Sequence, residues 1–170
     1  MKAIIQRVSK ASVSVDGEVI SSIGNGLCVL VGIKRDDGAA DMKYIVRKIL
    51  NTKIFDDDKG KKWGASVADN KYEILCISQF TLYHVLKGNK LDFHRAMPAQ
   101  ESEPFYMNFL AELRKDYVPE LVKGNVTDLI QDVRSILLHF ARIRDNEATS
   151  PRSLEIFIFD KFMQMVNLVQ

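Results

Sequence analysis

"MKAIIQRVSKASVSVDGEVISSIGNGLCVLVGI", residues 1–33, carries the clearest structural signals in this sequence. Residues 3–15 are rich in β-branched side chains, and a second alternating run follows at residues 18–23. Asp16-Gly17 separates the two runs, and Asp-Gly in this position is typical of a β-hairpin because both turn positions favour positive φ. After a second glycine-rich turn, residues 27–33 are apolar on both faces, which predicts a fully buried strand. The stretch therefore predicts an antiparallel hairpin followed by a core strand.

The rest of the first 124 residues predicts helices packed on further strands. Apolar residues spaced three and four apart are typical of an amphipathic helix, and polar strand ends mark the turns. In chain order we expect a helix carrying Met42, Ile45, Val46 and Ile49, a short strand at 53–55, and a solvated hairpin loop over the charged residues 56–62. A buried strand is expected next, at 72–80. The last element is a helix capped by Ser102, with Pro104 in its first turn, and its apolar face comprises Phe105, Phe109, Leu110, Leu113 and Tyr117. Residues 1–124 are therefore expected to form one α+β domain with mostly antiparallel strands.

The pattern changes at residue 125. Apolar residues from Val126 to Phe140 recur at helical spacing, which predicts an amphipathic helix with Asn125 as its cap. Residues 154–170 begin with strand-like residues and end in an apolar, methionine-rich tail. We therefore treat residues 125–170 as a separate C-terminal segment.

The composition is that of an ordinary globular protein of one domain, with 170 residues, 46% hydrophobic and 27% charged. A net charge of +2 permits contact with a polyanion without arguing for one. Cys28 and Cys76 lie in apolar runs, so we expect buried, reduced thiols. The N-terminus is charged too early for a signal peptide, and no apolar run approaches the roughly 18 residues of a membrane span. We expect a cytoplasmic protein that makes no use of a membrane.

The residues after the buried strand at 72–80 are the first candidates for a site. Ser78, Gln79 and Thr81 place hydroxyl and amide groups at a strand end, where sites are commonly built. The sequence holds no G-x-S-x-G, no zinc spacing around His84 and His94, and no glycine-rich phosphate loop. From residue types alone, structural hydroxyls and loop histidines are the favoured interpretation. The basic residues Lys87, Lys90 and Arg95 either solubilise the loop or face RNA.

The same stretch resembles a known family. Ser78-Gln79-Phe80-Thr81-Leu82 is similar to the S-Q-F-T-L signature of the D-aminoacyl-tRNA deacylases, and residues 1–33, VRKILNTKIFDDDKGKKW and LKGNKLDFHRAMPAQ also resemble that family up to about Lys123. The resemblance implies a mostly antiparallel, barrel-like sheet flanked by helices. It also implies a homodimer with active sites at the dimer interface, an aminoacylated tRNA as substrate, and neither metal nor cofactor. The expected reaction is hydrolysis of the ester between a D-amino acid and tRNA.

The resemblance also implies roles for particular residues. The backbone N–H groups near Phe80 and Thr81 are expected to hold the developing oxyanion, and Ser78 and Gln79 to shape the pocket for the terminal adenosine. Thr81 has two candidate roles, nucleophile or bystander to a water assisted by the ribose 2′-hydroxyl, and we favour the second because no base lies within sequence reach. The expected pocket wall comprises Phe93, His94, Ala96, Met97 and Pro98.

One family motif is missing. The family has a Gly-Pro pair that enters the partner subunit's pocket and captures the substrate's amino group, whereas the prolines of this chain follow Met97, Glu103, Val118 and Ser150. The alternative hypothesis is therefore a catalytically impaired isoform that acts through dimerisation or through binding a nucleic acid, either tRNA or DNA.

Overall fold

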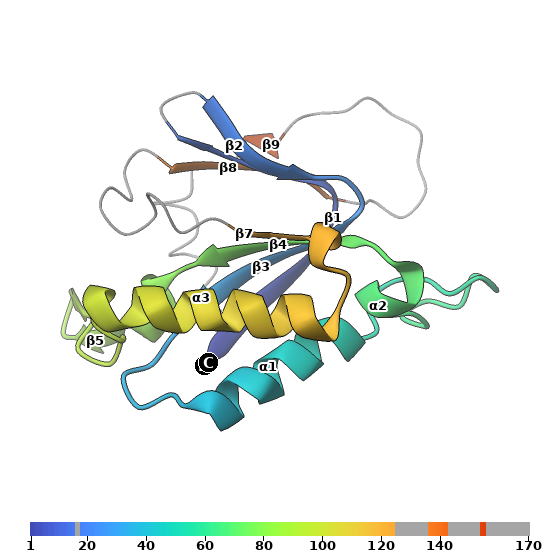
Figure 1. Ribbon diagram of the computed structural model, residues 1–170. Coiled ribbons are helices and arrows are strands. Elements are labelled where there is room, and N and C mark those ends of the chain that lie inside the picture. The colour runs from blue at the N-terminus through green and yellow to red at the C-terminus, as the bar shows by residue number, and fades with distance from the viewer. Residues whose placement is uncertain (16–17, 125–135, 143–153, 156–170) are drawn as a thin grey trace.

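The computed structural model describes the backbone of residues 1–15, 18–124, 136–142 and 154–155. The chain begins with three consecutive strands, and its helices lie between the later strands (Figure 1). The elements are β1 (Lys2–Val15), β2 (Glu18–Ile23), β3 (Gly26–Gly32), α1 (Ala39–Asn51), α2 (Val67–Asn70), β4 (Glu73–Ser78), the 3₁₀ turn η1 (Phe80–Tyr83), β5 (Val85–Lys87), β6 (Lys90–Asp92), α3 (Ala99–Asp116), the 3₁₀ turn η2 (Pro119–Leu121), β7 (Val122–Gly124), β8 (Ile136–Arg142) and β9 (Leu154–Glu155).

The long strand β1 organises the sheet. Its first half pairs antiparallel with β3, its second half pairs antiparallel with β2, and β8 pairs antiparallel along its other edge. Val8 marks the crossing point, since it lies opposite Gly26 of β3 and Arg142 of β8. The hairpin predicted from Asp16-Gly17 and the buried strand after it are both confirmed, and every residue of β3 is buried.

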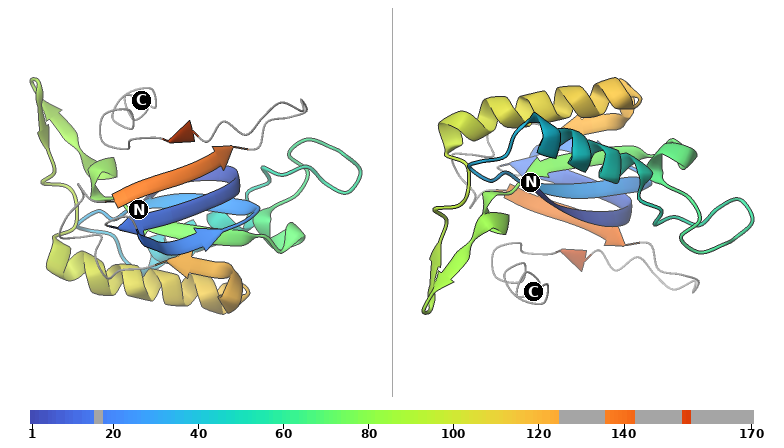
Figure 2. Two further views of the ribbon diagram at one scale, coloured as in Figure 1. Left: turned by 90° about the horizontal axis from the view of Figure 1, so that it is seen from above. Right: turned by 90° about the horizontal axis from the view of Figure 1, so that it is seen from below.

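The sheet is mixed. Its order is β7-β4-β3-β1-β8-β9, with β2 paired to β1, and the β3–β4 and β4–β7 pairs are parallel. Right-handed strand twist curls a sheet of this kind, and here β2 comes back toward β4 and β7. Figure 2 shows the resulting barrel-like arrangement from two opposite sides. The predicted fold class, a barrel-like α+β sheet flanked by helices, is confirmed.

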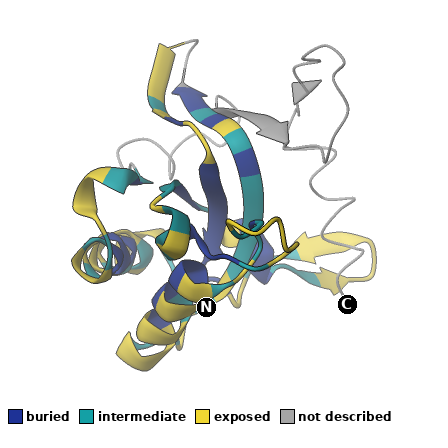
Figure 3. Ribbon diagram, turned by 90° about the vertical axis from the view of Figure 1, so that its right-hand side faces the viewer, coloured by how far each residue is buried: buried dark blue, intermediate teal, exposed yellow. Residues whose placement is uncertain are grey.

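Two hydrophobic clusters hold the curled sheet together. Helices α1 and α3 cover one face of β3 and β4, where Val46, Ile49 and Phe109 are fully buried. The second cluster includes Val8, Cys28 and Ile77 and lies on the opposite face, inside the curl. Figure 3 shows this burial along β3, with exposed residues on the outer sides of the helices. Among the described helices, none is long and apolar enough to cross a membrane.

Three local expectations need correction. Residues 53–55 form no strand, and a single antiparallel bridge joins Phe55 to Ala65 around the charged loop. Helix α3 begins at Ala99 with Pro98 as its N-cap, so Ser102 lies inside the helix and donates its hydroxyl to Ala99 O at 3.2 Å. Pro98 has φ −57°, and its carbonyl accepts from the first turn, so the helix starts four residues earlier than the Ser102 signal predicts. Pro104 accordingly lies within the helix rather than in its first turn.

The predicted helix at Val126–Phe140 is wrong over its last five residues, 136–140. Residues 136–142 are strand β8, because the open edge of β1 offers them a ladder of backbone hydrogen bonds. Residues 126–135, and the tail at 156–170, lie outside the described residues. Leu154–Glu155, expected to be strand-like, form β9 and pair with β8. The division of the chain at residue 124 stays a prediction.

Candidate active site

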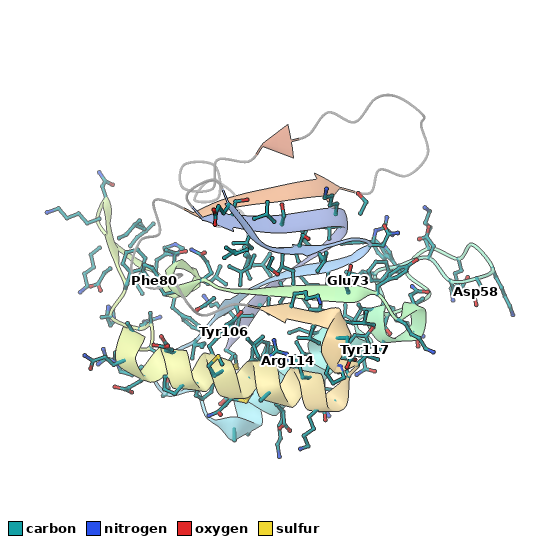
Figure 4. The ribbon with its side chains drawn as sticks, turned by 45° about the horizontal axis from the view of Figure 1, so that its top comes forward. Asp58, Glu73, Phe80, Tyr106, Arg114 and Tyr117 are labelled. Carbon is teal, nitrogen blue, oxygen red and sulfur yellow. The ribbon has the colours of Figure 1, made fainter. Side chains whose placement is uncertain are left out.

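The candidate site begins where β4 ends. Gln79 N–H donates to Val31 O at 2.7 Å, and the chain then leaves the sheet as the turn η1. Gly32 of β3 makes the close packing of this turn feasible, because an added Cβ would lie only 2.8 Å from the Cβ of Leu82. Figure 4 labels Phe80 at one end of β4 and Glu73 at the other. The predicted strand at 72–80 is thus confirmed as β4 over Glu73–Ser78, whereas Tyr72 and Gln79 lie outside the strand and Phe80 belongs to the turn.

The first two N–H groups of η1 are free within the described residues. Leu82 N–H donates to Gln79 O at 3.3 Å and His84 N–H to Thr81 O at 3.2 Å, whereas the N–H groups of Phe80 and Thr81 have no acceptor in the described part of the chain. Opening turns of helices leave such donors unsatisfied. Two adjacent backbone donors at a strand end are a suitable arrangement for binding an anionic oxygen.

The side chains around these donors differ in exposure. Phe80 is 42% exposed, whereas Thr81 is buried at 7%. Gln79 Nε2 donates to Thr81 Oγ1 at 2.5 Å, which orients the hydroxyl. His84 Nδ1 lies 2.9 Å from Thr81 O, so its ring contacts the threonine's carbonyl and not its hydroxyl. Ser78, the last residue of β4, is half-buried.

Lys2 holds the turn η1 through a contact that was not predicted from the sequence. Its Nζ donates to Leu82 O at 3.1 Å and lies 4.9 Å from the centroid of the Tyr83 ring. Burial, with smaller contributions from Asp37 and other carboxylates, raises the pKa of Tyr83 to about 12, so the phenol stays neutral at ordinary pH. No local sequence pattern links residue 2 with a turn eighty positions later.

The expected wall at residues 93–98 lies beside η1. The Phe93 ring meets Phe80 edge-on with 5.2 Å between centroids, and Ala96 and Met97 are buried. Met97 N–H donates to Ile33 O at 3.0 Å, which fixes this segment against the end of β3. Pro98 is half-buried and caps α3.

His94 differs from its wall neighbours because it is exposed. Its backbone N–H and its ring Nδ1 both contact Asp92 Oδ1, at 2.9 and 2.8 Å. The Lys87 ammonium, then the two contacts from His94, hold the pKa of the Asp92 carboxyl well below its usual range. His94 is therefore attached to the end of the β5–β6 hairpin, through Asp92 of β6.

The described residues contain no group of three or more His, Cys, Asp or Glu that could hold a metal ion. Cys28 and Cys76 are free and buried, as predicted. Burial raises the pKa of Cys28 to about 12 and raises that of Cys76 further, so neither thiol is a nucleophile at neutral pH.

Comparison with known proteins identifies the family. The family model described as D-Tyr-tRNA(Tyr) deacylase matches residues 4–133. The chain belongs to the D-Tyr-tRNA(Tyr) deacylase family. It is 59% identical over 123 residues to D-aminoacyl-tRNA deacylase 1 of Bos taurus, covering 72% of this chain. It is 50% identical over 137 residues to D-aminoacyl-tRNA deacylase of Dictyostelium discoideum, covering 80% of this chain and 91% of the relative. The chain spans 59% of the length of the Bos taurus relative.

Two solved structures resemble this chain in fold. One titled "c-Myc DNA Unwinding Element Binding Protein" has a TM-score of 0.77 and 50% identity, and the match covers 89% of this chain and 99% of that one. A second, titled as a probable eukaryotic D-amino acid tRNA deacylase, has a TM-score of 0.67 at 17% identity over 82% of this chain and 92% of that one. The second likeness shows the shared fold alone.

Proposed function

We propose that this family member hydrolyses the ester between a D-amino acid and tRNA, as a proofreading step of cytoplasmic translation. The free N–H groups of Phe80 and Thr81, placed beside the exposed Phe80 ring, carry this proposal. An aminoacyl ester is already activated, so its hydrolysis needs positioning and oxyanion stabilisation more than a strong nucleophile. The proposed substrate is accordingly an aminoacylated tRNA.

In the proposed mechanism, the ester carbonyl lies against η1. Attack on the carbonyl carbon moves charge onto its oxygen, which accepts hydrogen bonds from the N–H groups of Phe80 and Thr81. Each such donor contributes roughly 10²–10³-fold to the rate in enzymes that hydrolyse acyl groups. The Phe80 ring, held by Phe93, offers the terminal adenosine a stacking surface, and Ser78 and Gln79 border the same end of β4.

Water, rather than Thr81, is the proposed nucleophile. The Thr81 hydroxyl accepts from Gln79 Nε2, a neutral amide that cannot remove a proton. The ring nitrogen nearest to Thr81, Nδ1 of His84, contacts its carbonyl. The substrate's own ribose 2′-hydroxyl lies next to the ester and is the proposed group that assists the attacking water.

A second candidate function follows from the missing Gly-Pro pair. With the prolines of this chain preceded by Met97, Glu103, Val118 and Ser150, no Gly-Pro can capture the substrate's amino group. A solved structure at 50% identity carries a title that names DNA binding. The alternative is therefore a homodimeric, catalytically impaired form that binds tRNA or DNA.

Hydrolysis of D-tyrosyl-tRNA and L-tyrosyl-tRNA by the purified chain separates the two. The proposal predicts release of D-tyrosine at a rate well above that of tRNA with no protein. Hydrolysis of both esters would keep the deacylase but show that discrimination depends on the missing Gly-Pro. Hydrolysis of neither ester, by a chain whose circular dichroism shows it folded, would contradict the deacylase and favour the binding protein.

A further inference from the structure

The backbones of two arginines meet beside the candidate site. An isolated antiparallel bridge joins Lys34 to Ala96, and Arg35 N–H donates to Arg95 O at 3.1 Å. Both arginines lie in turns next to this bridge, so the hydrogen bond brings them together from two distant parts of the chain. Both residues are exposed.

Neither arginine has a carboxylate partner within the described residues. The nearby carboxylates are already engaged: Asp36 with the Lys34 ammonium at 2.7 Å, Asp37 with the N-terminal amino group, and Asp92 with Lys87 and His94. Two exposed positive charges at neighbouring positions, with no carboxylate partner among the described residues, favour an anionic ligand.

The chemistry of the pair fits a phosphate. Guanidinium groups present planar forks of N–H donors that bind phosphate oxygens two at a time, and their charge persists at all ordinary pH values. Two neighbouring guanidinium groups can together bind the oxygens of one phosphate. A single carboxylate would fill fewer of their donors.

The position of the pair suggests which phosphate. Arg95 is two residues after Phe93, whose ring contacts Phe80 of the oxyanion-binding turn. Arg35 is two residues after Ile33, which is bonded to the wall at Met97. A strand of nucleic acid whose last base rests on Phe80 would therefore pass the two arginines with its backbone.

We propose that Arg35 and Arg95 together bind one backbone phosphate of the 3′-terminal strand of the tRNA. This inference rests on the proposed function, since it takes tRNA as the ligand. In this proposal the two arginines bind the substrate, whereas η1 stabilises the transition state of the hydrolysis.

Binding of an unacylated RNA hairpin with a single-stranded 3′ CCA end tests the pair without any hydrolysis. The probe is labelled at its 5′ end, and its fluorescence anisotropy is followed with the full chain at several salt concentrations. The double variant Arg35→Gln/Arg95→Gln is expected to bind more weakly, with a log-log salt dependence shallower by about 0.7, the value of one single-strand phosphate contact. Its melting temperature is expected to stay close to that of the parent chain, because both side chains are exposed.

A matched control removes the same charge elsewhere. Arg47 and Lys48 are exposed on α1, where they flank the ring of Tyr44. The double variant Arg47→Gln/Lys48→Gln loses two positive charges away from the site and is expected to keep the parent's salt dependence. Equal effects of the two double variants would overturn the proposal, because they would reveal a general charge effect.

The remaining outcomes separate this inference from the deacylase proposal. If the chain hydrolyses D-tyrosyl-tRNA but the Arg35→Gln/Arg95→Gln variant binds the hairpin as the parent does, the arginine pair is wrong and the deacylase stands. If hydrolysis is absent but binding still depends on the pair, the phosphate site stands and the deacylase fails. Binding of a DNA hairpin of the same sequence as tightly as the RNA would overturn tRNA as the ligand.

Discussion

The ring of Phe80 meets that of Phe93 edge-on, with centroids 5.2 Å apart and planes inclined by 71°. This contact joins η1, the proposed oxyanion-binding turn, to the proposed pocket wall, thirteen positions further along the chain. Phe93→Ala would release the Phe80 ring, and an aromatic pair of this kind contributes about 0.5–1.5 kcal/mol beyond its buried area. We expect kcat/KM for D-tyrosyl-tRNA to fall by up to roughly tenfold. Leu91→Ala, an exposed residue of β6, is the control, and an equal loss in both variants would exclude a specific role for the ring pair.

Gly32→Ala is expected to displace η1. The new methyl group would lie 2.8 Å from Leu82 Cβ and 3.3 Å from Gln79 O, so the turn must move. Overpacking of this kind lowers the free energy of unfolding by about 1–3 kcal/mol, and deacylation should fall with it. Urea denaturation measures the first effect. Gly24→Ala is the matched control, since its methyl group would meet Glu73 Oε2 at an ordinary 3.5 Å. Equal stability of the two variants would show that η1 tolerates the shift.

The substrate's 2′-hydroxyl is expected to matter more than the hydroxyl of Thr81. Thr81→Val keeps the shape of the buried side chain and removes the acceptor of Gln79 Nε2. We expect a single-turnover rate within about tenfold of the parent, whereas tRNA acylated on the 3′-oxygen of a 2′-deoxy terminal adenosine should lose the roughly 10²–10⁴-fold of a general-base contribution. The reverse order of the two losses would make Thr81 the nucleophile.

Stability is expected to fall at alkaline pH because of the buried thiols. Burial raises the folded-state pKa of Cys28 from 9.0 to about 12, and that of Cys76 in the same direction. Raised pKa values contribute stability that is complete below the unfolded pKa and is lost as the pH rises toward the folded pKa. Between pH 8 and pH 10 each thiol should therefore lower the free energy of unfolding by about 1 kcal/mol.

Urea denaturation at the two pH values measures this loss. Cys28→Ala removes one of the two thiols and should reduce the loss by about half. An unchanged pH dependence in that variant would place its origin in other groups, such as Tyr83.

Removal of β8 is expected to expose the edge of β1. A chain ending at Gly124 keeps β1, β2 and β3 but lacks the strand that pairs with residues 8–15 of β1. Unpaired edge strands favour association with other chains. We expect a lower melting temperature and self-association in sedimentation velocity, whereas a chain ending at Glu155 keeps β8 and β9 and should behave like the full chain. A monomeric, equally stable chain ending at Gly124 would contradict this role of β8.

Much of the fold could be predicted from local pattern. The hairpin of β1 and β2, the uninterrupted apolar run of β3 and the helical spacing of α1 are each specified within a few residues, and all three agree with the structure. The turn at Phe80 was identified by its similarity to a family signature. The residue types alone favoured structural hydroxyls there.

The remaining features depend on contacts between distant residues. The apolar spacing of residues 136–140 suits both a helix and a strand, and the open edge of β1 decides between them. Lys2 reaches Leu82, and Arg35 pairs with Arg95, across sixty positions or more. Such pairings follow from how the sheet closes, which no local window of sequence contains.

The pairing of β1 with both β3 and β8 has a consequence for synthesis. Because β1 leaves the ribosome shortly before β2 and β3, it can pair with both as soon as residue 32 emerges. Its other edge has to wait for residues 136–142, more than a hundred residues later. At a bacterial or eukaryotic elongation rate of about 5–20 residues per second, that edge stays open for roughly 5–20 s on every nascent chain. During this period the open edge of β1 is exposed to chaperones and to neighbouring nascent chains.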